Sequence, residues 1–174
     1  MFVYIIAYIQ QKLNPADQTE TGQIISISFL VLNAVGFILP AFVLEPITEK
    51  IGRVKTHLTC VAIMAIGYFG IVFIGKSSII LYMLMAVCGI GWAAIVSLPF
   101  AIMSEKVDQS RMGFFMGIFN LSVVLPQLIV SLVLGYYIQE ALDKNLIFVI
   151  SGTTLAISAV LWLFVKDRKP EISV

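Results

Sequence analysis

Residues 88–131 read CGIGWAAIVSLPFAIMSEKVDQSRMGFFMGIFNLSVVLPQLIVS, two apolar stretches separated by one short charged segment. That segment runs from Ser104 to Arg111 and holds four charged side chains in eight residues. The apolar stretches have the length of helices, and helices satisfy their own backbone hydrogen bonds inside lipid. We therefore interpret residues 88–131 as parts of two membrane-spanning helices joined by a charged loop.

The first apolar stretch carries a small residue at every fourth position. These residues are Gly89, Ala93, Ser97 and Ala101. A spacing of four places them on one helix face, where small side chains let a neighbouring helix approach closely. Pro99 lies in the same stretch and removes one backbone hydrogen bond, so we expect it to bend the helix.

The second stretch opens with Gly113-x-x-x-Gly117, a spacing typical of packed membrane helices. It then places polar residues and a proline inside an apolar span: Asn120, Ser122, Pro126, Gln127 and Ser131. A helix that only fills space in lipid does not need these groups. We predict that Asn120 and Gln127, seven residues apart and on one side of the helix, line a solute pathway together with Ser97. The alternative is that Asn120 and Gln127 form hydrogen bonds that hold neighbouring helices together.

The whole chain is strongly apolar. Of its 174 residues, 60% are hydrophobic and 12% are charged, and its mean hydropathy is +1.01. Soluble domains are about 25% charged. The sequence therefore predicts an all-α polytopic membrane protein whose main partner is the lipid bilayer. The net charge of +1 and the lack of a basic run argue against nucleic-acid binding.

Five apolar segments that can span a bilayer follow one another. They are 24–44, 58–75, 79–103, 112–138 and 146–165. Residues 1–9 are apolar but short, and we expect them to be the end of a truncated helix. Residues 10–23 read as an exposed loop and residues 166–174 as a charged tail. Five spans and a partial one amount to half of a twelve-helix transporter, with an N-terminal half outside this chain.

The basic residues predict the orientation. One side of the membrane holds eight of the eleven lysines and arginines: Lys50, Arg53, Lys55, Lys106, Arg111, Lys166, Arg168 and Lys169. Lys12, Lys76 and Lys144 lie on the other side. Cytoplasmic loops are enriched in basic residues, so we expect a cytoplasmic C-terminus and an extracytoplasmic 10–23 loop. The short loops favour a bacterial inner membrane.

Residue types that carry catalysis are sparse. No Asp, Glu, Lys, Arg or His lies in the middle of a predicted span, and no H-E-x-x-H or G-x-S-x-G motif occurs. Cys60 and Cys88 with the single His57 do not form a metal-ligand set. We predict no enzyme activity, no metal and no cofactor. If a proton is the coupling ion, we expect its carboxylate outside this segment.

Residues 45–55, EPITEKIGRVK, resemble the signature loop of the major facilitator superfamily, G-x-x-x-D-R-x-G-R-R/K, in its second copy. The matching positions are Glu49, Lys50, Gly52 and Arg53. The departures are Glu45 for the leading glycine, lysine for arginine at position 50, and Val54 for a basic residue. The resemblance implies a cytoplasmic gate, and the alternative is a plain topology signal. In the next loop, we expect Glu105 and Arg111 to form a gate contact across the turn, and the alternative is a solvated pair within the loop.

A second resemblance is to the sucrose and glycoside branch of that superfamily (glycoside-pentoside-hexuronide-like transporters). The branch carries S-x-P-F-A and, on the next helix, G-x-x-N-L-x-x-V-x-P-Q-x-x-V-S. The matching residues are Ser97, Pro99, Phe100, Ala101, Gly117, Asn120, Leu121, Val124, Pro126, Gln127, Val130 and Ser131. This resemblance covers most of 24–165 and implies the C-terminal six-helix half of the fold. It further implies symport of a sugar or glycoside with protons or another cation.

Two further side chains suit a sugar pathway. Asn33 and Trp92 lie near the middle of their spans, the depth at which such transporters bind solute. Sugars are bound by amide and hydroxyl hydrogen bonds and by stacked aromatic rings. The alternative for Asn33 is a hydrogen bond between helices, and the alternative for Trp92 is core packing or contact with lipid. For the whole protein, the alternative is a membrane scaffold or sensor derived from a transporter half.

Overall fold

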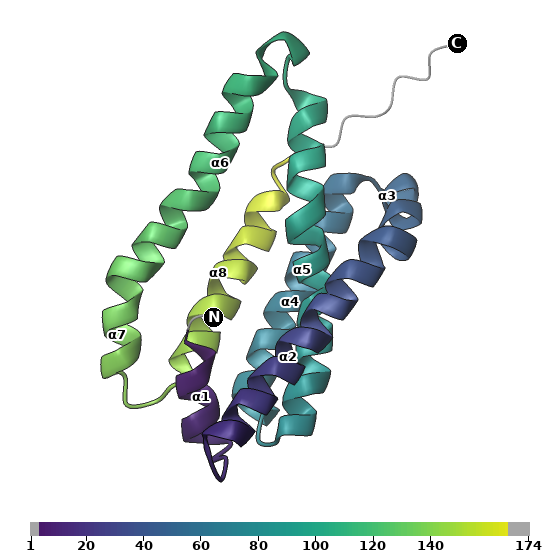
Figure 1. Ribbon diagram of the computed structural model, residues 1–174. Coiled ribbons are helices and arrows are strands. Elements are labelled where there is room, and N and C mark those ends of the chain that lie inside the picture. The colour runs from purple at the N-terminus through teal and green to yellow at the C-terminus, as the bar shows by residue number, and fades with distance from the viewer. Residues whose placement is uncertain (1–3, 167–174) are drawn as a thin grey trace.

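The computed structural model describes residues 4–166, and within that range it is built from helices without a strand (Figure 1). The α-helices are α1 (Ile5–Lys12), α2 (Gln18–Leu39), α3 (Glu45–Ile51), α4 (Arg53–Ile74), α5 (Ser78–Lys106), α6 (Met112–Ile129), α7 (Gly135–Glu140) and α8 (Leu146–Trp162). Two π-helices, η1 (Pro40–Leu44) and η3 (Val130–Leu134), and a 3₁₀ turn, η2 (Gln109–Arg111), continue them. The prediction of an all-α membrane protein is confirmed.

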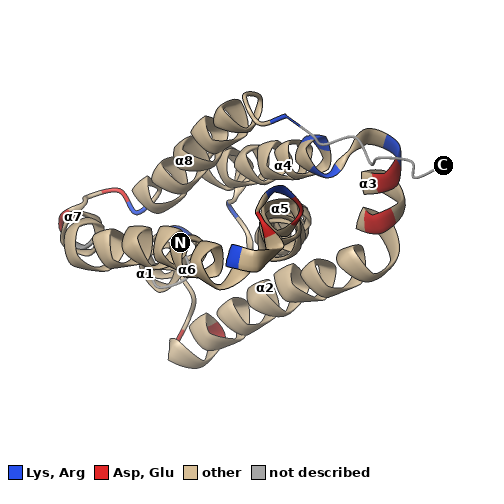
Figure 2. Cartoon of the chain, turned by 90° about the horizontal axis from the view of Figure 1, so that it is seen from above, with Lys and Arg blue, Asp and Glu red and all other residues tan. Residues whose placement is uncertain are grey.

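The helices run between two ends of the molecule (Figure 1). One end, called the gate end here, holds the turn at Gly52 and residues 104–111. The opposite end, called the clasp end, holds residues 13–17, 75–77 and 141–145. Figure 2 colours the charged residues, which lie on the turns and helix ends, while the rest of the described ribbon is uncharged. This distribution is the one expected of helices that cross a bilayer.

Helix α5 lies at the centre of the bundle and packs against α2 and α4, while α8 packs on the outer side of α4 (Figure 2). Glycines make the close approaches. A Cβ on Gly89 would lie 2.8 Å from the carbonyl oxygen of Leu32 on α2, and a Cβ on Gly91 would lie equally close to that of Cys60 on α4. Ala93 is fully buried. Helix α5 therefore touches α2 and α4 almost backbone to backbone.

The segment Gln109–Ile138, called the arm here, stands apart from the bundle of α2, α4, α5 and α8 (Figure 1). None of the 18 residues in its most apolar window is buried. A Cβ on Gly113 or Gly117 would meet nothing within 4 Å. These two glycines therefore make no close helix contact among residues 4–166, and the packing expected of them stays a prediction that needs another partner.

The prolines have different local effects. Pro99 lies inside the continuous helix α5, whereas Pro40 begins the π-helix η1 and Pro126 precedes the π-helix η3 by four residues. Proline donates no backbone hydrogen bond, and a widened turn is one way in which a helix adapts to that loss. Pro126 therefore changes the helical repeat of the arm rather than ending it.

Helices extend further into the expected loops than the composition suggested. Within residues 10–23, α1 continues to Lys12 and α2 begins at Gln18, because the Asp17 side chain accepts a hydrogen bond from the backbone N–H of Glu20 and caps the helix. The segment between the expected spans 24–44 and 58–75 is also helical, with a break at Gly52 between α3 and α4.

Four helical segments are long and apolar enough to cross a membrane: Gln18–Ile51, Arg53–Ile74, Ser78–Lys106 and Gln109–Ile138. Helix α8 is also apolar, and its 17 residues are at the short end of the range for a spanning helix. The membrane boundaries of the five expected spans stay predictions. The tail beyond residue 166, with Arg168 and Lys169, lies outside the described residues.

Candidate solute pathway and gate

The polar residues of α6 form one exposed stripe. At about 100° per residue, Gly113, Gly117, Asn120 and Gln127 fall on the same side of the helix, and Ser131 continues the stripe into η3. Asn120 and Gln127 are both exposed. The neighbouring face, with Phe114, Leu121 and Leu125, is also exposed but entirely apolar. The arm therefore has an apolar face and, beside it, a face that carries two amide side chains.

The structure separates Asn33 and Trp92 from that stripe. The Asn33 amide donates to the carbonyl oxygen of Phe29 in its own helix, at 2.8 Å. The indole of Trp92 fits against Gly36, where a Cβ would lie 2.8 Å from the ring carbon Cδ1. Trp92 thus serves the contact between α2 and α5, which favours the packing interpretation for this residue.

Ser97 lines an open pocket of about 210 Å³ at the gate end. The lining residues come from three parts of the chain: Pro40, Leu44, Glu45 and Thr48, then Arg53, then Ser97, Leu98 and Ala101. The Ser97 hydroxyl donates to the carbonyl oxygen of Ala93, at 2.7 Å. The row of small residues on α5 thus packs tightly at Gly89 and Ala93 and opens into the pocket at Ser97 and Ala101.

The gate end is organised by the turn at Gly52. Gly52 has φ 90° and ψ 153°, a region of backbone conformation that is essentially restricted to glycine. It ends α3 and begins α4, and it places Arg53 beside α5. There the Arg53 guanidinium forms an ion pair with the Glu105 carboxylate. This contact joins the signature loop to the end of α5.

The expected contact between Glu105 and Arg111 is not the one formed. Glu105 pairs with Arg53, and the Arg111 guanidinium lies 5.4 Å from the centre of the Phe114 ring. Arg111 follows Asp108, whose carboxylate accepts a hydrogen bond from the backbone N–H of Ser110 and so caps the 3₁₀ turn. That cap turns the chain so that the Arg111 side chain lies over Phe114, within the arm. Glu49 and Lys50 are exposed on α3.

The family model of the Major Facilitator Superfamily matches residues 1–173. This chain belongs to the major facilitator superfamily. The superfamily consists of membrane transporters, so the fold of this chain is that of a transporter. No solved structure gives a significant match to this chain.

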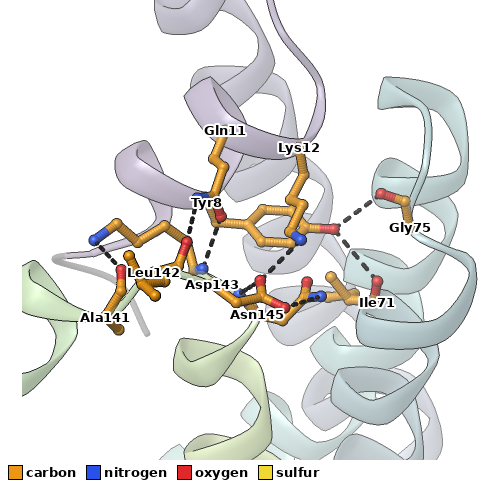
Figure 3. A network of polar contacts seen from close by, with 10 residues as sticks. Tyr8, Gln11, Lys12, Ile71, Gly75, Ala141, Leu142, Asp143 and Asn145 are labelled. Atoms are coloured by element: carbon orange, nitrogen blue, oxygen red, sulfur yellow. Dashed lines mark hydrogen bonds and ion pairs between the residues drawn. The ribbon is translucent and has the colours of Figure 1, made fainter.

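This major facilitator chain has a second polar cluster that the sequence did not point to, at the clasp end (Figure 3). Gln11 and Lys12 on α1 contact residues 141–145 between α7 and α8. The Lys12 ammonium and the N–H of Asn145 hold the pKa of the Asp143 carboxyl below its usual range. The Lys12–Asp143 pair is therefore present at neutral pH and is lost only as the pH falls through that lowered pKa.

The signals for these contacts are weak in the sequence. Gln11 and Lys12 stand in a polar run that is typical of an exposed loop, and the partner of Arg53 is 52 positions further along the chain. Among residues 4–166, no three His, Cys, Asp or Glu side chains gather closely enough to hold a metal ion. The candidate site is therefore made of amides, hydroxyls and one charged pair.

Proposed function

We propose that this chain is the C-terminal half of a secondary active transporter that moves a sugar or glycoside by alternating access, in symport with protons. The observation that carries the proposal is the stripe on α6. Exposed amides such as Asn120 and Gln127 are costly in hydrocarbon, but they are the hydrogen-bonding groups that a sugar needs. A stripe facing a water-filled path between two halves of a transporter explains their position.

The ion pair at the gate end supports the alternating-access part of the proposal. Arg53 and Glu105 join the signature loop to the end of α5, beside the pocket that Ser97 lines. A pair of this kind favours the conformation in which these ends are together, and a few kcal/mol is enough to bias two conformers. We place the gate end on the cytoplasmic side because six of the nine basic residues among residues 4–166 lie there. The short loops favour the inner membrane of a bacterial cell.

The functional test is solute uptake by the full-length protein in proteoliposomes. An inward proton gradient should drive accumulation of a labelled disaccharide or glycoside, and a protonophore should abolish the accumulation. Facilitated uptake that does not depend on the proton gradient would contradict only the proposal that protons are the coupling ion. No uptake of any saccharide, with or without a gradient, would contradict the transporter proposal and leave the scaffold or sensor alternative.

A further inference from the structure

Among residues 4–166, the arm has few attachments outside its own segment. The close backbone contacts of α6 are with η2 and η3, its own neighbours in sequence. At the gate end, the ring of Phe119 meets that of Phe100 on α5, with centroids 6.3 Å apart. The middle of the arm, which carries Asn120 and Gln127, is exposed. The position of the stripe therefore depends on what holds the two ends of the arm.

At the clasp end, the arm is held by α1. Ile138 is buried in the cluster that contains Ile5 and Ile9 of α1, and the Tyr4 hydroxyl lies against Gly135. The Lys144 ammonium donates to the carbonyl oxygens of Ile138 and Ala141, at 2.9 and 2.8 Å. These bonds satisfy the carbonyl groups at the end of α7, which a helix end leaves without partners.

Two side chains of α1 then fix the segment that follows the arm (Figure 3). The Gln11 amide donates to the carbonyl oxygen of Leu142 at 2.7 Å and accepts from the backbone N–H of Lys144 at 2.8 Å. The Lys12 ammonium lies 2.8 Å from the Asp143 carboxylate. Gln11 therefore uses both ends of its amide on backbone groups of residues 141–145, and Lys12 adds an ion pair to the same segment.

Helix α1 is itself anchored to the core. The Tyr8 hydroxyl is buried and bonds the carbonyl oxygens of Ile71 and Gly75 at the end of α4, at 3.3 and 2.9 Å. The Tyr8 ring meets that of Phe148 on α8 edge to face, with centroids 4.7 Å apart. A continuous path of contacts thus runs from α4 through α1 to the end of the arm.

We propose that Gln11 and Lys12 are positioning residues for transport, which set the rotation and depth of the arm and so of Asn120 and Gln127. They touch no solute. They act by holding residues 141–145 against α1, so that the arm moves together with α1 and does not swing by itself. The part of this inference that concerns solute rests on the proposed function, while the part that concerns the arm does not.

The test is a distance measurement in the full-length protein with spin-labelled cysteines at Leu128 on α6 and Ile66 on α4, both exposed positions. The native Cys60 and Cys88 are replaced by alanine in every sample. In the double variant Gln11→Ala/Lys12→Met, we expect the distance distribution to widen at least twofold, with KM for the labelled disaccharide of the uptake assay raised at least tenfold. Lys76→Met is the matched control, an exposed lysine at the same end, and should change neither value.

If the double variant does not fold, the single variant Lys12→Asp and the exchange Lys12→Asp/Asp143→Lys replace it. The single variant should widen the distribution, and the exchange should narrow it again. An unchanged distribution of spin-label distances in a folded variant of Gln11 or Lys12 would overturn the inference, whatever happens to transport. A widened distribution in a protein that moves no saccharide would support the positioning of the arm and contradict only the proposed function.

Discussion

Replacing Gly91 by leucine is expected to destabilise the bundle more than any other single change to a glycine on α5. A Cβ at this position would overlap the Cβ of Met64 and lie 2.8 Å from the carbonyl oxygen of Cys60, within helix α4. The backbone of α4 cannot give way locally, so α4 and α5 must separate. Overpacking of a core costs about 1–3 kcal/mol and occasionally more, and here the larger value applies because a backbone atom is in the way.

The measurement is the thermal unfolding midpoint of the purified full-length protein in detergent, together with its elution profile in size-exclusion chromatography. Gly22→Leu is the matched control, since a Cβ at Gly22 meets nothing within 4 Å. Its midpoint should stay within a few degrees of that of the wild type. Equal midpoints for Gly91→Leu and the wild type would contradict the packing of α4 against α5 described above.

Reversing the charge of Arg53 is expected to shift the conformational equilibrium of the transporter. Arg53 and Glu105 are both partly exposed, and such pairs contribute about 0.2–1 kcal/mol because water screens them. The variant Arg53→Glu replaces this attraction by a repulsion of similar size. A total change of up to about 2 kcal/mol corresponds to roughly thirtyfold in a two-state population. We expect the conformer with a closed gate end to lose population and transport to slow accordingly.

Two further variants separate the pair from the charge. The exchange Arg53→Glu/Glu105→Arg should recover at least half of the lost rate, because an ion pair of opposite polarity forms at the same place. Lys55→Glu makes the same change of charge two residues along α4, at an exposed position, and should leave the rate near that of the wild type. Equal losses in Arg53→Glu and Lys55→Glu would mean that loop charge, and not the pair, matters.

The fold was accessible from the sequence because it follows from composition. Long apolar stretches in lipid have to be helices, and the turn at Gly52 is visible as a short motif with a fixed glycine. The partner of Arg53 could not be predicted from the sequence, because charged residues in loops have no periodic pattern that indicates which loops are in contact. For the same reason Glu105 was assigned to Arg111, its neighbour in sequence, and not to Arg53.

The contacts of Gln11 and Lys12 with residues 141–145 illustrate a second limit. Gln11 forms hydrogen bonds with backbone groups of residues 141–145. Because nearly every residue carries the same backbone groups, the residue types in this segment do not predict the contact. The exposure of the arm could not be predicted either. Its sequence predicts a membrane span, and that prediction does not say whether other helices cover its apolar face and its polar stripe. Trp92 shows the converse case, a residue with the right chemistry for sugar stacking that is placed against Gly36.

We expect the polar stripe of α6 to face water and its neighbouring apolar face to face lipid or protein. The most direct measurement compares Gln127→Cys with Leu121→Cys in the full-length protein in membrane vesicles, using a water-soluble, membrane-impermeant thiol reagent. Both positions are exposed on the same helix, and the native Cys60 and Cys88 are buried. We predict rapid labelling at position 127, slowed by the transported saccharide, and no labelling at position 121. Equal reactivity at the two positions, or labelling at position 127 that no saccharide slows, would contradict a solute pathway along this stripe.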